Sequence, residues 1–374
     1  MEYKKYKLEV LSPLSIGDGN EHKRFEYIFD RRDNVVKIID IIKLLESNEK
    51  SPIIDNIILA FEQMHFNWNE QLRQYRFNIN DFILYKVESD TVNIKGEILS
   101  YIKTAGRPYI PGTSIKGAIR STLTKGAFDK IGMSYKKSID FFKDQKEKNP
   151  KKNYLKKIDD RAEEKEFGKP NNSPFRFLKI SDSDALQFSD INVYEIKVLN
   201  ICNGKLKWHI RNGNEEDFEK ANSIFLEALK PGSIALGNFE LDKRLFDDDI
   251  KTEGKIVNTE ILKDFTKIIR DTVNNYIDSE INFYDKYDLT KIVEFYKGLK
   301  SIKLKDNEFL LQIGYGTGSL SKTINNNLEI DYLNKLKIIG LNISDINLYP
   351  KTRKIIFKNG RPDSVPGWIK VCLD

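Results

Sequence analysis

The apolar residues of this chain follow two different spacings, and neighbouring segments change from one to the other. Over residues 231–241 they fall at nearly every second position, which predicts a strand. Over residues 259–281 they recur every three or four positions in one stripe, which predicts a long helix with Asn258 or Thr259 as its N-cap. No short repeat of fixed period is present. Strands and helices therefore alternate irregularly, and we predict an α+β fold.

The same two spacings predict the other elements. Strands are expected over residues 3–11, 25–29, 35–39, 94–101, 175–180, 193–201, 205–210, 308–313, 354–357 and 368–373. Helices are expected over residues 40–45, 52–68, 114–128, 215–229 and 289–299, and a glycine loop over residues 16–20. A composition rich in lysine sets residues 134–172 apart and predicts an exposed insertion that is helical or partly mobile.

A chain of 374 residues is long enough for two domains, and we place the boundary near residue 185. The predicted N-terminal domain, residues 1–185, carries the insertion at about 134–172. The predicted C-terminal domain, residues 186–374, carries a glycine-rich loop. Sixty-two Lys and Arg residues against 56 Asp and Glu residues leave a net charge of +6, which permits a polyanion partner without requiring one.

Several classes of protein are excluded by what the sequence lacks. No apolar run approaches the roughly 18 residues of a membrane helix or the core of a signal peptide, so we expect a cytoplasmic protein without membrane partners. Cys202 and Cys372 are the only cysteines, too few for a disulfide framework. The histidines His22, His65 and His209 form no metal-binding pattern, and we expect neither a metal site nor a cofactor. The number of cysteines and histidines does not exclude a magnesium site made of carboxylates.

The segment 109–123 combines a turn with a helix start. Pro111 and Gly112 predict the turn, and Thr113 or Ser114 is a natural N-cap for the helix that follows. A helix N-terminus offers unpaired backbone N–H groups and a partial positive charge, both of which suit phosphate. The segment therefore predicts an anion-binding turn.

Three residues further along this helix extend the prediction. Lys116 and Arg120 stand four positions apart and so share one helix face. Gly117 costs a helix about 1 kcal/mol relative to alanine, which indicates that something approaches the backbone closely. The segment lacks the Gly-Lys-Ser/Thr ending of a Walker A loop, and two cations suit a chain of phosphates better than one anion. A helix that needs a glycine only for tight packing is the structural alternative.

A second glycine segment spans residues 313–323. Gly314, Gly316 and Gly318 alternate with other residues and give an open, flexible backbone ahead of a predicted helix. Tyr315 is suited to stacking on a base, and Lys322 to neutralising a phosphate. The segment lacks the strand-to-helix spacing and the distal acidic residue of a dinucleotide site, and the presence of two such glycine segments indicates phosphate binding better than either alone.

Five segments together resemble the RAMP superfamily of CRISPR-associated RNA-binding proteins. They are residues 11–19, 109–123, 178–183, 314–323, and 350–353 with 366–370. The stretch Pro-Gly-Thr-Ser-Ile-Lys-Gly-x-x-Arg, for example, is similar to the family's Pro-Gly-Ser-Ser-Leu-Lys-Gly-x-x-Arg. The order and spacing run over nearly the whole chain. Within the superfamily, the resemblance is greatest to the subunits that cap the 3′ end of the guide RNA in type III-A (Csm) effector complexes.

This resemblance implies RRM-like, ferredoxin-like domains, two in tandem, with helical insertions. It implies a non-catalytic subunit that binds the 3′ region of the guide RNA (crRNA) and supports its maturation in antiviral defence. It also implies other Csm subunits as partners. Host nucleases that trim the 3′ end are compatible partners, although no segment indicates such a contact.

Under this interpretation further cations become candidate RNA contacts. His22, Lys23 and Arg24 follow the first glycine loop, although an exposed hairpin edge explains them equally well. Arg353, which stands beside Lys354, is a weaker candidate. The full predicted RNA-binding set is His22, Lys23, Arg24, Gly112, Thr113, Ser114, Lys116, Gly117, Arg120, Gly314, Tyr315, Gly316, Gly318, Lys322 and Arg353.

Two other functions remain open from the sequence. One is a metal-independent RAMP endoribonuclease that processes guide precursor, with His22 as the acid or base, because such chemistry usually needs a histidine near the attacked phosphate. The other is a protein scaffold whose cations are only solvated surface. Salt dependence of RNA binding separates the scaffold from an RNA-binding protein, because phosphate contacts weaken as salt rises.

Overall fold

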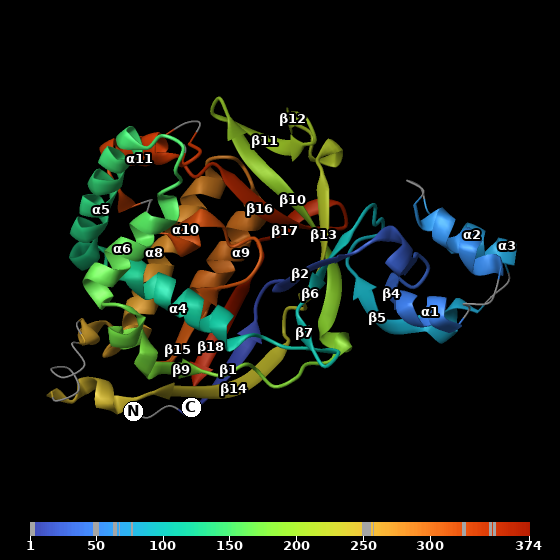
Figure 1. Cartoon of the computed structure of the whole chain (residues 1–374), viewed down its shortest axis with the longest axis horizontal. Helices are drawn as coiled ribbons and strands as arrows, with labels where there is room; N and C mark the ends of the chain where they lie inside the picture. Colours follow the sequence, from blue (N-terminus) through green and yellow to red (C-terminus); the bar gives the residue numbers. More distant parts are fainter. Residues whose placement is uncertain are drawn as a thin grey trace.

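The computed structural model (Figure 1) describes residues 4–47, 52–62, 66, 68–75, 78–248, 256, 258–323, 327–343, 346 and 349–374. His65 lies outside the described residues. Within them, strands and helices are mixed along the chain, which confirms the predicted α+β class.

A five-stranded antiparallel sheet forms one half of the core. Its order is β15 (Glu308–Gln312), β18 (Trp368–Leu373), β1 (Lys5–Val10), β14 (Ile234–Leu241) and β9 (Leu178–Ile180). Helix α4 (Gly112–Gly126) is one of the elements between β1 and β9 in the chain, and α8 (Phe265–Asp285) follows β14. The order β18-β1-β14-β9 with these two helices is that of a ferredoxin-like domain, as predicted, and β15 extends its edge.

The larger sheet is organised around the twelve-residue strand β10 (Ile191–Cys202). One edge of β10 pairs with β13 (Ser223–Leu229) and then β11 (Lys205–Ile210); the other pairs with β5 (Ile83–Ser89) and then β16 (Thr352–Lys358). The remaining strands extend this sheet or form short ribbons: β2 (Gly17–His22), β3 (Tyr27–Asp30), β4 (Val35–Ile39), β6 (Ile98–Tyr101), β7 (Lys103–Thr104), β8 (Arg107–Pro108), β12 (Gly213–Glu215) and β17 (Arg361–Ser364).

Helices lie at both ends of the molecule (Figure 1). One group is α1 (Ile41–Ser47), α2 (Pro52–Phe61) and α3 (Trp68–Tyr75), which stands at the end farthest from α5 (Phe128–Lys148), α6 (Leu155–Phe167) and α11 (Ile330–Ile339). The others are α9 (Thr290–Ser301) and the short α10 (Gly318–Lys322). No helix in the described part of the chain is long and apolar enough to cross a bilayer.

The lysine-rich insertion is helical, as predicted, but it is also part of the core. Tyr135, Ile139 and Phe142 of α5 and Ile158 of α6 are buried in the main apolar cluster. Ion pairs between Lys136 and Glu329 and between Lys335 and Asp140 join α5 to the region of α11. The segment thus forms a packed helical layer and not a loose appendage.

Several element predictions are wrong. Residues 215–229 form no α-helix but a short 3₁₀ turn at Phe218–Lys220 and then strand β13, whose two faces are both buried, so its apolar residues do not alternate. Residues 17–20 belong to strand β2 and not to a loop. The long helix begins at Phe265, after a 3₁₀ turn at Thr259–Leu262, and neither Asn258 nor Thr259 caps it. Residues 52–68 include the start of a second helix, α3.

The two sheets draw strands from both sides of residue 185. In the five-stranded sheet, β1 and β9 precede that position, whereas β14, β15 and β18 follow it. In the larger sheet, β5 pairs directly with β10 across it. We therefore keep residue 185 as a proposed division of the sequence only.

Candidate nucleic-acid interface

Four segments that lie apart in the sequence line one cavity of about 680 Å³. They lie at β2, on β6, on the first turns of α4, and at the end of β15 with α10. Of the predicted RNA-binding residues, the cavity is lined by Thr113, Ser114, Gly117, Gly314, Tyr315 and Lys322. The structure thus brings the two predicted glycine segments together.

The cavity wall mixes apolar and polar groups. Ile16, Leu99 and Ile313 contribute apolar surface, while Ser121 and Lys322 contribute a hydroxyl and an ammonium group. A nucleotide has the same two parts, a flat apolar base and a charged phosphate. The lining is therefore chemically suited to a nucleotide of any sequence.

The start of α4 is held by protein and not left open. The backbone N–H of Gly112 donates to Asp182 Oδ1 at 2.8 Å, and a Cβ at this position would overlap the backbone carbonyls of Ile180 and Ser181. Pro111 is the N-cap residue, so the prediction of Thr113 or Ser114 as cap is wrong; both line the cavity instead. Gly112 is required by packing against the residues that follow β9.

Gly117 has a different environment from Gly112. A Cβ at position 117 would meet no atom within 4 Å, and the residue is exposed on the cavity wall. No neighbouring protein segment demands a glycine here, in contrast to the tight-packing alternative. Its absence of a side chain leaves the helix backbone accessible from the cavity.

Lys116 and Arg120 do not line the cavity. Arg120 forms an ion pair with Glu163 of α6, and its guanidinium lies 5.7 Å from the ring centre of Phe175. Burial, and next the charge of Arg120, lower the pKa of Lys116. The two cations share a helix face, as their spacing predicts, but that face is turned toward α6.

The glycine loop after β15 needs its glycines for distinct reasons. Gly314, Gly316 and Gly318 have φ values of +82°, +87° and +76°, in the left-handed region that disfavours side chains. A Cβ on Gly314 would overlap the carbonyl oxygen of Ser15, the same oxygen that accepts the N–H of Tyr315 at 2.7 Å. A Cβ on Gly318 would meet nothing within 4 Å.

Gly314→Ala is therefore expected to destabilise the protein more than Gly318→Ala. Both variants bear about 1–2 kcal/mol for a left-handed alanine. Only Gly314→Ala adds the overlap with Ser15, which we expect to cost roughly 1–3 kcal/mol more. Chemical denaturation of both variants measures the difference, and equal losses would show that the loop can move away from Ser15.

Lys354 lies beside the cavity, against the lining residue Tyr315. Its ammonium lies 4.3 Å from the ring centre of Tyr315, so one face of that ring is already covered. Burial, and next the charge of Lys322, lower the pKa of Lys354. Lys322 Nζ itself lies 3.4 Å from the carbonyl oxygen of Gly314. The two neighbouring ammonium groups have no carboxylate partner among the described residues, an arrangement that favours an anion.

Arg353 points elsewhere. Its guanidinium makes a forked contact with the buried carboxylate of Glu280 at 2.9–3.1 Å and donates to the Pro350 carbonyl at 2.7 Å. It also lies 4.2 Å from the ring centre of Phe283. Adjacent strand residues face opposite ways, so Arg353 enters the core while Lys354 reaches Tyr315.

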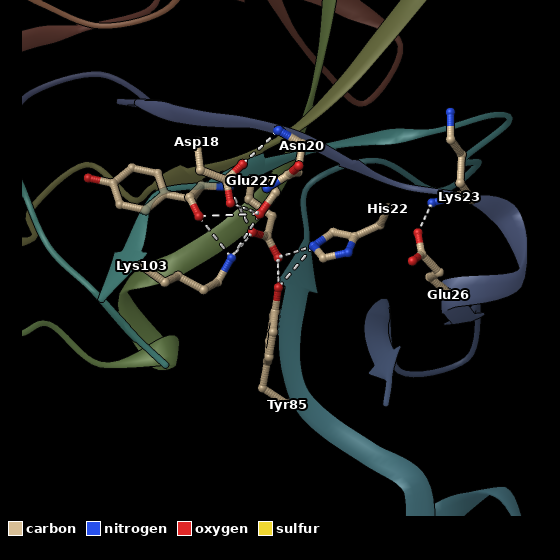
Figure 2. A network of polar contacts seen from close by, with 10 residues as sticks. Asp18, Asn20, His22, Lys23, Glu26, Tyr85, Lys103 and Glu227 are labelled. Carbon is tan, nitrogen blue, oxygen red and sulfur yellow. Dashed lines mark hydrogen bonds and ion pairs between the residues drawn. The ribbon is translucent and has the colours of Figure 1, made fainter. Parts of the chain in front are cut away.

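His22 belongs to a buried polar network around Glu227 (Figure 2). The Glu227 carboxylate accepts from the Tyr85 hydroxyl at 2.6 Å, the Tyr101 N–H at 2.9 Å and Lys103 Nζ at 2.6 Å. Burial would raise the pKa of Glu227, but the hydrogen bond from His22 and the charge of Lys103 outweigh it and hold the pKa at about 2. The carboxylate is therefore ionised.

The hydrogen bond between His22 and Tyr85 belongs to the same network. Tyr85 has one hydroxyl hydrogen and donates it to Glu227, so the ring nitrogen is the donor in the contact of His22 Nε2 with the Tyr85 oxygen at 3.0 Å. His22 does not line the cavity. Its neighbours Lys23, paired with Glu21, and Arg24 are also outside the cavity lining.

A model of the RAMP superfamily matches residues 7–321, and the chain belongs to this superfamily. It is 27% identical over 395 residues to the CRISPR system Cms protein Csm5 of Methanocaldococcus jannaschii, covering 98% of this chain and 88% of that protein. It is also 28% identical over 151 residues to the Csm5 protein of Enterococcus italicus, covering 31% of this chain and 41% of that protein.

Two solved structures share the fold. One is a chain of the cryo-EM structure of a Csm–crRNA–target RNA ternary complex of a type III-A CRISPR-Cas system, with a TM-score of 0.70, 20% identity and full coverage of both chains. The other is the crystal structure of T. onnurineus Csm5, with a TM-score of 0.65, 18% identity and coverage of 97% of this chain and 99% of that one. These likenesses confirm the predicted RAMP fold.

Proposed function

We propose that the chain is a non-catalytic, RNA-binding subunit of a type III-A (Csm) CRISPR effector complex. In this role it binds and caps the 3′ region of the crRNA, supports its maturation and contributes to antiviral defence in the cytoplasm. Its partners are crRNA and other Csm subunits. The similarity to Csm5 proteins over nearly the whole chain supports this proposal.

The observation that carries the RNA-binding role is the convergence at the cavity. Backbone and hydroxyl groups of Thr113 and Ser114 stand on one wall, and Lys322 with the nearby Lys354 on the other. Neutral donors and ammonium groups hold phosphates without reading bases. A subunit that accepts guides of any sequence needs this kind of contact.

The double variant Lys322→Ser/Lys354→Ser is expected to weaken binding of single-stranded RNA by roughly tenfold to a hundredfold near physiological salt. Two lost phosphate contacts should also reduce the slope of log K against log salt by about 1.4, because each contributes about 0.7. Fluorescence anisotropy with RNAs of different sequence, at several salt concentrations, measures both.

The matched control is Lys297→Ser/Lys303→Ser, which removes two exposed lysines that do not line the cavity. An equal loss in the control would mean that only net charge matters. A flat salt dependence for the unmodified protein would favour the scaffold. Cleavage of a guide precursor that disappears in His22→Ala, with RNA binding retained, would favour the endoribonuclease.

A further inference from the structure

A cluster of exposed lysines stands where α5 ends and α6 begins. Its members are Lys148, Lys151, Lys152, Lys156 and Lys157, called here the lysine cluster. Tyr154, in the middle of the cluster, is buried in the core and stacks on Phe142 with ring centres 5.4 Å apart. The turn that carries these lysines is thus anchored to the fold.

The lysine cluster has no ion-pair partner among the described residues. Nearby acids are engaged elsewhere: Glu147 pairs with Lys143 at 3.0 Å, and Glu163 pairs with Arg120. Asp159 is hydrogen-bonded by Tyr135. The ammonium of Lys157 lies 5.8 Å from the centre of the Tyr154 ring. Asp160 of α6 stands within four positions of Lys156 and Lys157, but no ion pair joins it to either lysine among the described residues, so the five ammonium groups keep a net positive charge.

Two of these lysines also stand against the helix dipole. Lys156 and Lys157 lie in the first turn of α6, which contains no acidic residue. A cation at a helix N-terminus is disfavoured by about 0.3–1 kcal/mol, and crowded ammonium groups repel one another as well. The unfavourable helix position and the repulsion among the ammonium groups both oppose folding of the isolated protein. A bound polyanion offsets both, because its negative charge attracts the lysines and suits the helix N-terminus.

The composition of the lysine cluster favours RNA over a protein partner. Lysine is depleted in protein–protein interfaces, whereas nucleic-acid interfaces are rich in positive charge. No large apolar residue within the turn is exposed, since Tyr154 is buried. We propose that the lysine cluster binds the phosphate backbone of single-stranded RNA beyond the nucleotides held in the cavity, by charge and without sequence preference.

The test is a variant with all five cluster lysines changed to glutamine, assayed on RNAs of about 30 and about 6 nucleotides, the shorter being within the site size of one small domain. Affinity for the long RNA is expected to fall at least tenfold at low salt, and its salt slope to fall by roughly 2 to 3.5. Affinity for the short RNA should stay unchanged. The thermal midpoint should not fall, since repulsion is relieved.

The matched control changes five exposed lysines elsewhere to glutamine: Lys267, Lys286, Lys291, Lys297 and Lys303. An unchanged affinity of the cluster variant for the long RNA, or an equal loss in the control, overturns the proposal. So does equally tight binding of poly-glutamate, which would indicate an acidic protein partner. Weak binding of the short RNA by the unmodified protein would contradict RNA binding in the cavity, which is the proposed function, and not RNA binding by the lysine cluster. The experiment therefore distinguishes failure of one proposal from failure of the other.

Discussion

Replacement of Glu227 by glutamine is expected to lower the free energy of unfolding by about 3–5 kcal/mol. The Glu227 side chain is fully buried and accepts hydrogen bonds from Tyr85, Tyr101 and Lys103. Glutamine keeps the shape but removes the charge, and it leaves the Lys103 ammonium, whose side chain is only 15% exposed, without its counter-ion. Urea denaturation followed by tryptophan fluorescence measures the loss.

Two companion variants make the cause of this loss visible. Removing both charges, as Glu227→Gln/Lys103→Met, should recover part of the stability, because no buried charge is then left unpaired. Glu240→Gln removes the partner of Lys179 in an exposed pair and should cost less than about 1 kcal/mol. A loss from Glu227→Gln no larger than that of Glu240→Gln would contradict a charge-based role.

The same carboxylate predicts an acid-sensitive fold. Its pKa is lowered from 4.5 to about 2, so between these values the unfolded chain binds a proton that the folded protein does not. Glu227 therefore contributes stability that is present above pH 4.5 and is lost as the pH falls toward 2. The contribution is about 3 kcal/mol. When the free energy of unfolding is measured against pH, this contribution should be absent in Glu227→Gln.

This network also supports the cavity. Tyr101 and Lys103 lie on or beside β6, and His22 lies on β2, the two paired strands whose residues Glu21 and Ser100 line the cavity. Loss of the Glu227 charge should thus loosen one cavity wall. RNA affinity of Glu227→Gln should fall even where the variant is fully folded.

Arg353→Met is expected to be as destabilising, by about 3–5 kcal/mol, without changing the salt slope of RNA binding. Arg353 is the forked partner of Glu280, whose side chain is 1% exposed, so the variant leaves a buried carboxylate unpaired. The loss comes from the desolvated charge that remains, because a buried carboxylate without its partner has neither water nor a cation to stabilise it.

Urea denaturation at neutral pH tests this expectation, with Arg361→Met as the control. Arg361 is exposed on β17, and its replacement should change stability by no more than about 0.5 kcal/mol. A reduced salt slope in Arg353→Met, at a temperature where the variant is folded, would restore Arg353 as an RNA contact. A loss no larger than that of Arg361→Met would contradict the buried ion pair.

Sequence spacing predicts elements well where one face is buried. The apolar stripe of α8 and the strand β14 illustrate this, although Ile234 and Leu236 of β14 are exposed on the outer face of the sheet. It fails for β13, where Phe225 and Leu226 are buried on opposite faces and alternation disappears. The misassignment of residues 215–229 as a helix has this physical cause.

The candidate site shows a similar division. Glycine segments are recognisable from the sequence because positive φ values and close backbone approaches need glycine, as at Gly314. The direction of a side chain cannot be recognised in the same way. The sequence therefore favours Arg353 as an RNA contact, whereas in the structure its neighbour Lys354 is the residue that reaches Tyr315. Glu227 carries no local signal at all, since its partners Tyr85 and Lys103 lie more than 100 positions away along the chain.

The five-stranded sheet places the earliest described strand beside the latest. Strand β1 is hydrogen-bonded on one edge to β18, and Trp368 donates to Ser12 across 356 positions of sequence. Closing such long loops is slow, and folding rates fall as contacting residues lie farther apart. Until β18 arrives, one edge of β1 stays unpaired and open to other strands. We therefore expect the chain to fold slowly during synthesis and to depend on chaperones. Surface changes from Lys to Gln should not alter this dependence, because they leave the pairing of β1 with β18 unchanged.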